Sequence, residues 1–153
     1  QNEETRYRKV LKEWYKDERD FINDIIPLVK SLPQQPVKTK ADLLIENLQK
    51  EGFFNLEKVQ ALTALNQKEL IKLFIQSMAY AIAMFDYLGY CDFLDKEKGT
   101  KTKANYIMSK LFNENAKDGT QVRHYRNSLI KNKPRYTSYL HKEKVIKDYE
   151  QLK

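Results

Sequence analysis

Few side chains in this sequence could perform nucleophilic, acid–base or metal chemistry. The chain contains one cysteine, Cys91, and two histidines, His124 and His141. No two of them have the spacing of a zinc site, and no glycine-rich stretch has the spacing of a phosphate-binding loop. Nothing near Cys91 in the sequence would activate it as a nucleophile. We therefore expect no catalytic residue, no metal site and no cofactor, and we interpret Cys91 as a small buried side chain.

Arg135 and His141 offer one catalytic alternative. Their order and spacing resemble the Arg and His motif of helical HEPN-type ribonucleases. That resemblance implies that His141 would act as a general base on a ribose hydroxyl and that Arg135 would stabilise the phosphate charge. Tyr136 stands where that family usually has a small polar residue, so a ribonuclease is the lesser alternative.

The last third of the chain concentrates positive charge. Residues 96–153 contain 15 Lys and Arg against 6 Asp and Glu, whereas residues 1–95 contain 13 against 15. A segment of such charge density attracts polyanions and raises their rate of encounter. We expect duplex DNA as the binding partner, and an anionic membrane surface or an acidic protein as the alternative partners.

A helix expected at residues 121–131 is the candidate reader of DNA bases. Gln, Arg and Asn side chains match the donors and acceptors that purines present in the major groove, whereas Lys and Arg contacts to phosphates position the protein. The residues off the apolar side of this helix are Gln121, Arg123, His124, Asn127 and Lys131. The candidates for phosphate contacts are Lys101, Lys103, Lys110, Arg126, Lys133 and Arg135, together with Thr120, the expected N-cap, whose helix end would favour a phosphate.

Further helices must position these side chains. A helix expected at residues 102–112, a polar loop and the helix at 121–131 give the layout of a helix-turn-helix DNA reader. Residues 135–139 then form either a short extended wing or a loop into a last helix at 139–152, with Leu140, Val145, Ile146 and Tyr149 inward. A helix pair that binds an unknown protein partner is the main alternative.

The rest of the sequence also predicts helices. Only four Gly and four Pro occur, and apolar residues recur at helical spacing from residue 3 to residue 32. Pro27 should kink or end that first helix, a core helix, near Ile26. Thr39 and Asp42 have the spacing of a capping box, and Gly52 is placed to end their helix.

The most hydrophobic stretch, residues 67–88, predicts a central buried helix of an all-α bundle. Its apolar residues surround nearly the whole helix. We expect Asn66 to cap it, Gly89 to end it, and residues 90–94 to form a connector. We divide the chain into a scaffold, residues 1–95, and a basic helical region, residues 96–153, packed as one unit.

Residues 70–152 combine these features in a fixed order. An apolar helix (LIKLFIQSMAYAIAMFDYLGY) and a polar turn precede a Lys-rich helix, an aromatic–Arg step and a basic segment with aromatic residues. The Lys-rich helix lies around residues 106–111, and the aromatic–Arg step is Tyr125 and Arg126. The basic segment contains Arg135, Thr137, Tyr139 and Leu140. This layout resembles RteC-type regulatory proteins of bacterial conjugative transposons. The resemblance implies an all-helical, winged-helix-like regulator that acts on promoter DNA.

The expected cellular location follows from the absence of certain sequence patterns. It has no run of 18 apolar residues without charge, so we expect no membrane insertion. The first residues do not have the pattern of a secretory signal, and a single cysteine fits a reducing compartment, so we expect a cytoplasmic protein. A homodimer is compatible with the sequence.

Overall fold

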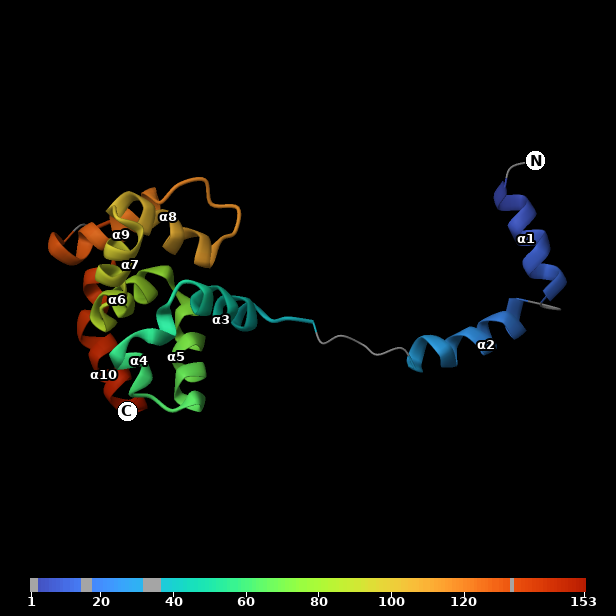
Figure 1. Cartoon of the computed structure of the whole chain (residues 1–153), viewed down its shortest axis with the longest axis horizontal. Helices are drawn as coiled ribbons and strands as arrows, with labels where there is room; N and C mark the ends of the chain where they lie inside the picture. Colours follow the sequence, from blue (N-terminus) through green and yellow to red (C-terminus); the bar gives the residue numbers. More distant parts are fainter. Residues whose placement is uncertain (1–2, 15–17, 32–36, 133) are drawn as a thin grey trace. The chain divides into compact units, whose positions relative to one another are not determined.

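The structure is a computed structural model of the whole chain, and it describes residues 3–14, 18–31, 37–132 and 134–153 (Figure 1). Within these ranges the protein is all-α, as predicted, with helices α1 to α10, the short 3-10 helices η1 and η2, and no strand. The chain forms two compact units, Gln1–Val37 and Lys38–Lys153. The division falls after Val37 rather than after residue 95, and residues 38–95 and 96–153 belong to one unit.

The first unit contains α1 (Glu3–Trp14) and α2 (Glu18–Ser31). Pro27 lies inside α2, which continues to Ser31, so, of the kink or end predicted near Ile26, the end does not occur. A proline lacks the N–H of one backbone hydrogen bond, and α2 accommodates that loss without ending. Tyr7, Val10 and Ile22 are between 45% and 67% exposed, so within the first unit they are not buried as a core helix would require.

The second unit begins with α3 (Lys40–Lys50), whose first turn has the predicted capping box. The Asp42 N–H donates to Thr39 Oγ1 at 3.2 Å, and the Thr39 N–H donates to Asp42 Oδ2 at 3.0 Å. After α3, Gly52 has a φ of 77° and lies against the ring of Phe93, so a side chain at this position would be strained and would clash. η1 (Phe53–Asn55) and α4 (Glu57–Gln60) follow.

The long helix predicted at residues 67–88 is two helices, α5 (Ala64–Gln76) and α6 (Met78–Leu88). Ser77 separates them with an extended backbone, φ −161° and ψ 127°, and its Oγ accepts a hydrogen bond from the Tyr80 N–H. Thr63, and not Asn66, caps α5. Eight of the eleven residues of α6 are buried, and α6 packs against α5, α7, α9 and α10.

The apolar residues after Gly89 form a helix instead of the predicted connector. Gly89 ends α6 with a φ of 82°, as expected, and α7 (Tyr90–Lys98) starts at the next residue. Tyr90, Cys91 and Leu94 are buried on one side of α7, a spacing that a helix satisfies better than an extended connector. Cys91 is 1% exposed, as predicted, and burial raises the pKa of its thiol to about 12.

Four more elements complete the second unit: α8 (Lys101–Phe112), α9 (Thr120–Ile130), η2 (Ser138–His141) and α10 (Lys142–Leu152). The last α-helix starts three residues later than predicted, after the 3-10 turn. That change of helix type turns Leu140 outward, 63% exposed, and Ile146 is 44% exposed. Val145 and Tyr149 are buried as expected.

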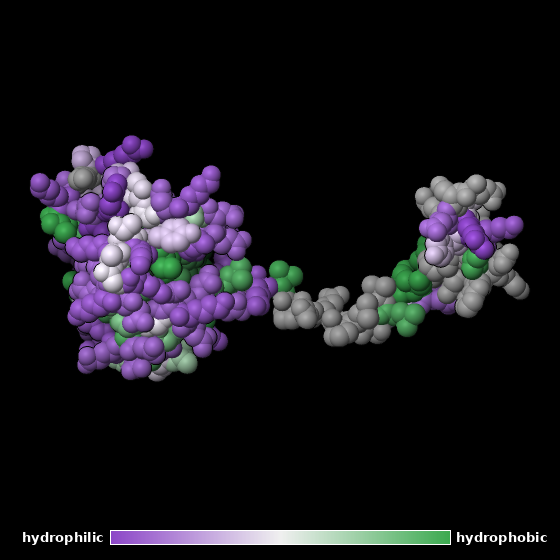
Figure 2. Space-filling view, turned by 45° about the horizontal axis from the view of Figure 1, so that its top comes forward, coloured by the Kyte–Doolittle hydropathy of each residue, from purple (hydrophilic) through white to green (hydrophobic). Residues whose placement is uncertain are grey.

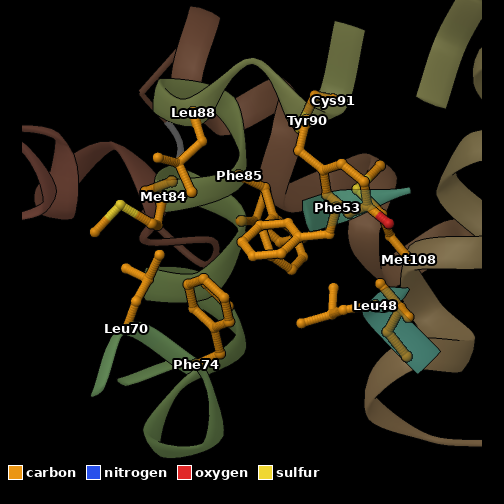
Figure 3. Close-up of a cluster of buried hydrophobic side chains, with 14 of the residues drawn as sticks. Leu48, Phe53, Leu70, Phe74, Met84, Phe85, Leu88, Tyr90, Cys91 and Met108 are labelled. Atoms are coloured by element: carbon orange, nitrogen blue, oxygen red, sulfur yellow. The ribbon is translucent and has the colours of Figure 1, made fainter. Parts of the chain in front are cut away.

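An aromatic cluster forms the centre of the second unit (Figure 3). The rings of Phe74, Phe85 and Tyr90 lie within 5.9 Å of the Phe53 ring, measured between centroids. Such tilted and edge-on pairs add to the free energy of burial. Leu48 and Met108 close the cluster from α3 and α8, so the core ties the elements before residue 95 to those after it.

The surface around this core is mainly hydrophilic on the face that Figure 2 shows, with apolar side chains in small patches. In the part of the chain that the structure describes, no helix is long and apolar enough to cross a lipid bilayer.

Candidate nucleic-acid interface

The candidate reading helix, α9, is held on several sides by other elements. Val122, Ser128 and Leu129 are buried, and α9 packs against α6, α8 and η2. At its start, a Cβ added to Gly119 would lie 2.5 Å from the backbone carbon of Asn105. Only glycine permits this approach, so residues 113–119 bring the start of α9 against the middle of α8.

Thr120 does not cap α9 as predicted. The N-cap position belongs to Gly119, which has no side chain to make a capping hydrogen bond, and Thr120 is the first helical residue. The Thr120 N–H donates to Asp118 Oδ1 at 3.1 Å. A carboxylate therefore already occupies one of the N–H groups that we expected to favour a phosphate.

Arg126 serves the fold instead of facing a phosphate as predicted. Its guanidinium makes two hydrogen bonds to the Asp95 carboxylate, at 3.0 and 2.7 Å, and a third, at 2.7 Å, to Asn105 Oδ1. The Arg126 and Asp95 side chains are only 14% and 17% exposed. Burial is the largest single influence and would lower the pKa of Arg126, but the hydrogen bonds to Asp95 and the negative charges around the guanidinium together raise it. This ion pair fastens α9 to α7.

One side of α9 remains uncovered, and several predicted base contacts lie on it. Arg123, Asn127 and Ile130 are exposed at a spacing of four and three residues, which places them on one face of the helix. Thr120 and Lys131 fall on the same side by that spacing. We call these five residues the α9 face. Gln121 is exposed but points away from that side of the helix, about 100° from Thr120.

His124 and Arg135 lie beside the α9 face, and both contact the Tyr136 ring. The His124 and Tyr136 rings stack with centroids 4.7 Å apart and planes at 17°, and the Tyr125 ring meets Tyr136 edge-on at 5.3 Å. The Arg135 guanidinium is 5.9 Å from the centre of the Tyr136 ring. Pro134 and Arg135 form a turn, Tyr136 is a single β-bridge residue, and η2 begins at Ser138, so the described part of this segment contains an isolated bridge and no extended strand. Lys133 lies outside them.

The cations of α8 form a separate group. Lys103 and Lys110 are exposed, and with Tyr106 they share one side of α8 at helical spacing. The Lys110 ammonium lies 5.2 Å from the centre of the Tyr106 ring. Lys101 is exposed in the first turn. None of the interactions seen among the described residues joins Lys101 or Lys103 to the α9 face.

Part of the positive charge is neutralised within the second unit. Lys98 pairs with Glu51 at 2.8 Å, and Lys144 pairs with Asp148 at 2.6 Å. The Lys142 ammonium donates to the backbone carbonyl of Leu129. Among the described residues, Arg123, Lys131 and Arg135 are exposed cations on or next to α9 that form no ion pair.

The Arg135 and His141 pair of the ribonuclease alternative is not joined by any contact that the described residues show. The His141 ring meets the Tyr80 ring edge-on, with centroids 5.7 Å apart. Burial, aided by the charge of Lys144, lowers the pKa of His141. The Tyr80 hydroxyl donates to Asp148 at 2.6 Å, so the neighbours of His141 are engaged in contacts within the fold.

Sequence reasoning missed Asp95 and Asn105, which hold Arg126. They lie 31 and 21 residues away along the chain, and no local pattern connects them to Arg126. It also did not single out Ile130, which is 84% exposed on the α9 face. A helical projection of residues 120–131 carries that signal, because Ile130 falls about 20° from Arg123 and about 80–100° from the buried Val122 and Leu129.

The described residues contain no group of three or more His, Cys, Asp and Glu side chains that could hold a metal ion. No protein-family model, no curated protein and no solved structure matches the chain.

Proposed function

We propose that this protein binds duplex DNA by placing the α9 face in the major groove, as a regulator of the RteC type that its sequence resembles. The observation that carries the proposal is the α9 face itself. Arg123 and Asn127 project from an uncovered side of a helix that α6, α8 and η2 hold in place. A rigid helix with one open polar face is what major-groove reading requires.

The chemistry of these side chains supports base reading. Arg can donate two hydrogen bonds to guanine, and Asn can pair with the edge of adenine. From Arg123 to Ile130 the α9 face extends about 10 Å along the helix axis, a length that suits contact with a few successive base pairs. The Arg126–Asp95 pair holds α9 against α7 beside this face and limits the freedom of Arg123 and Asn127 to shift.

Ile130 adds an apolar contact to this reading face. An aliphatic side chain that is 84% exposed has no role in the core. In the major groove, the C5 methyl group of thymine is the apolar feature that such a side chain recognises. We propose that Ile130 contacts a thymine. Replacing that thymine by uracil should weaken binding about fourfold, as one lost methyl contact would, and Ile130→Ser should remove the difference.

Lys101, Lys103, Lys131 and Arg135 are proposed to contact phosphates. Each phosphate that a cation neutralises releases counterions, so the logarithm of affinity falls with the logarithm of salt concentration. With about four such contacts, we expect roughly a hundredfold loss of affinity between 50 and 200 mM salt.

The test is a fluorescence-anisotropy titration of a duplex selected from a random pool, repeated across salt concentrations. Lys101→Ala and Lys103→Ala should weaken binding to all sequences and reduce the salt slope by about one each. Lys68→Ala, which removes an exposed lysine on α5, is the matched control and should change neither quantity. Absent binding, or binding that does not respond to salt, would refute the proposal.

A second candidate is a helical module that binds another protein. The pairing of Arg126 and Lys98 with Asp95 and Glu51 favours it, because the acidic residues in the first part of the chain neutralise these two cations. Under this alternative, no duplex from the pool would be enriched, and Arg123→Ala would leave DNA affinity unaltered.

A further inference from the structure

A groove with an apolar floor runs along α3 on the second unit. It lies between α3 and the C-terminal part of α8, and it reaches the break between α5 and α6. Its main part has a volume of about 590 Å³. A smaller hollow of about 220 Å³ continues it along α3 and α8. The two share Asn47, Lys110, Leu111 and Glu114, so they form one surface, which we call the α3–α8 groove.

The floor of the α3–α8 groove is built from core side chains, and its rim exposes two more apolar ones. Leu44, Phe74 and Leu111 are at most 7% exposed and form part of the floor. Leu43 and Ile75 line the same groove but are 47% and 42% exposed. Apolar side chains exposed together in a concave surface lose contact with water when a partner covers them.

The charges along the α3–α8 groove favour an acidic occupant. Lys40, Lys50 and Lys110 line it, and none of them forms an ion pair within the ranges that the structure describes. Of its two carboxylates, Glu51 is already paired with Lys98, and Glu114 is exposed. The groove therefore presents three cations around an apolar floor, with one carboxylate left to oppose them.

The walls of the groove decide the form of the occupant. The long walls, α3 and α8, are helices, whose backbone N–H and C=O groups bond within each helix. The non-helical lining is confined to Ser77 and residues 113–115, and none of it is a strand, so the groove offers no strand edge on which an extended peptide could pair. Its long wall, α3, extends about 16 Å from Lys40 to Lys50, the length of three helical turns. We propose that the α3–α8 groove binds an acidic amphipathic helix of a partner protein, which buries apolar side chains on Leu43 and Ile75.

This proposal does not depend on DNA binding. It shares only Lys110 with the residues predicted to contact nucleic acid. In the proposed complex, apolar anchors at i, i+3, i+4 and i+7 of the partner helix cover the groove, and its carboxylates approach Lys40, Lys50 and Lys110. The charge pairs mainly set the choice of partner, whereas the apolar contacts supply most of the affinity.

The test uses the full chain and two fluorescein-labelled helical peptides of about 14 residues. Both carry leucine at i, i+3, i+4 and i+7 on an alanine background; one carries glutamates on its flanks and the other carries lysines at the same positions. Fluorescence anisotropy should show the acidic peptide binding about tenfold more tightly than the basic one. Equal affinities, or tighter binding of the basic peptide, would overturn the proposal.

Substitutions in the α3–α8 groove test whether the peptide binds there. Leu43→Ser combined with Ile75→Ser should weaken binding of the acidic peptide about tenfold, and Lys110→Glu should reduce its advantage over the basic peptide. Leu65→Ser, which is 69% exposed on α5 and outside the groove, is the control and should leave both affinities unchanged. Thermal unfolding of each variant confirms that it is folded. Peptide binding that survives the Leu43 and Ile75 changes contradicts the assignment to this groove.

Sedimentation velocity of the unmodified chain tests the other occupant. A monomer over the concentration range used for peptide binding is expected. Self-association that Leu43→Ser with Ile75→Ser abolishes would mean that a second copy fills the groove, and would overturn the choice of a partner helix.

Discussion

Arg126 lies within the basic part of the chain, yet its guanidinium is bound inside the protein by Asp95 and Asn105. Arg123, three residues earlier, is exposed. The two differ in position on the helix and not in chemistry, because residue 126 turns toward α7 and α8 while residue 123 turns to the solvent. Counting charges along the sequence cannot separate these roles, so each cation must be placed on its helix before a binding role is assigned.

The Arg126–Asp95 pair should stabilise the fold. Asp95→Asn leaves a largely buried guanidinium without a counter-charge, so we expect the free energy of unfolding to fall by about 2–3 kcal/mol, less than for a fully buried pair. Lys72→Ala removes an exposed pair with Glu69 and should cost less than about 0.5 kcal/mol. Urea unfolding measures both. If Asp95→Asn and Lys72→Ala lower the free energy of unfolding by similarly small amounts, the Arg126–Asp95 pair stabilises the fold no more than an exposed ion pair does.

His141 should make stability depend on pH. Burial, together with the charge of Lys144, lowers its pKa in the folded state, so the unfolded chain takes up the proton first as the pH falls. The pKa shift of His141 therefore has no effect on the free energy of unfolding at pH 8. It lowers that free energy as the pH falls through about 6.5, the ordinary pKa of histidine. The difference in melting temperature between the wild type and His141→Gln, measured from pH 8 to pH 5, should shift in favour of the variant toward acid. A difference that stays constant would contradict this.

At the scale of elements, the features that the sequence predicts best are those that residues within one helical turn determine. The Thr39–Asp42 capping box and the end of α6 at Gly89 depend on residues within one turn, and both are found. The break at Ser77 was missed because serine in an apolar run resembles a residue of a continuous helix. Its role as an N-cap depends on the direction in which α5 and α6 leave that point, and tertiary packing sets those directions.

The same distinction applies to the candidate site. The inward side of α9, with Val122 and Leu129, follows from the helical period, and this leaves Arg123 and Asn127 outside as predicted. The roles of Arg126, Thr120 and Gly119 could not be predicted. They depend on α7, on Asp118 and on the backbone of α8, and no periodicity in the sequence records which elements come together.

Gly119 should be essential to the placement of α9. Its φ of −100° is allowed for any residue, but a methyl group at this position would meet the α8 backbone at 2.5 Å. Gly119→Ala should therefore lower the free energy of unfolding by about 1–3 kcal/mol, as for overpacking in a core. Thr120→Ala, which removes no capping hydrogen bond, should cost less than about 0.5 kcal/mol. Chemical denaturation compares them, and the reverse order would contradict this account of how α9 begins.

At the scale of the molecule, the second unit contains the whole of the hydrophobic core that the structure describes, from Leu44 to Tyr149. Residues 96–153 do not form a domain of their own, because Met108, Val122 and Tyr149 share that core with α3 to α7. The basic helices are thus a face of one unit and not an appendage. Any ligand bound by α9 would act on the stability of the entire second unit.

Residues 38–153 should fold without the first unit. Because no described core residue lies before Leu44, deletion of residues 1–37 should change the melting temperature of the remaining chain by less than about 4 °C. Differential scanning calorimetry of the two chains tests this. Loss of the cooperative transition in the shorter chain would show that the first unit contributes to the core.

The central claim is that the α9 face reads DNA bases, and the sequence preference of single variants tests it most directly. The measurement is the ratio of affinities for the selected duplex and for a scrambled duplex of equal composition, compared between the wild type, Arg123→Ala and Lys103→Ala. We predict that Arg123→Ala lowers the ratio by about 5- to 150-fold, the value of one bidentate base contact, and that Lys103→Ala lowers both affinities while leaving the ratio intact. A wild-type ratio near one, or equal effects of the two variants on it, would contradict the claim.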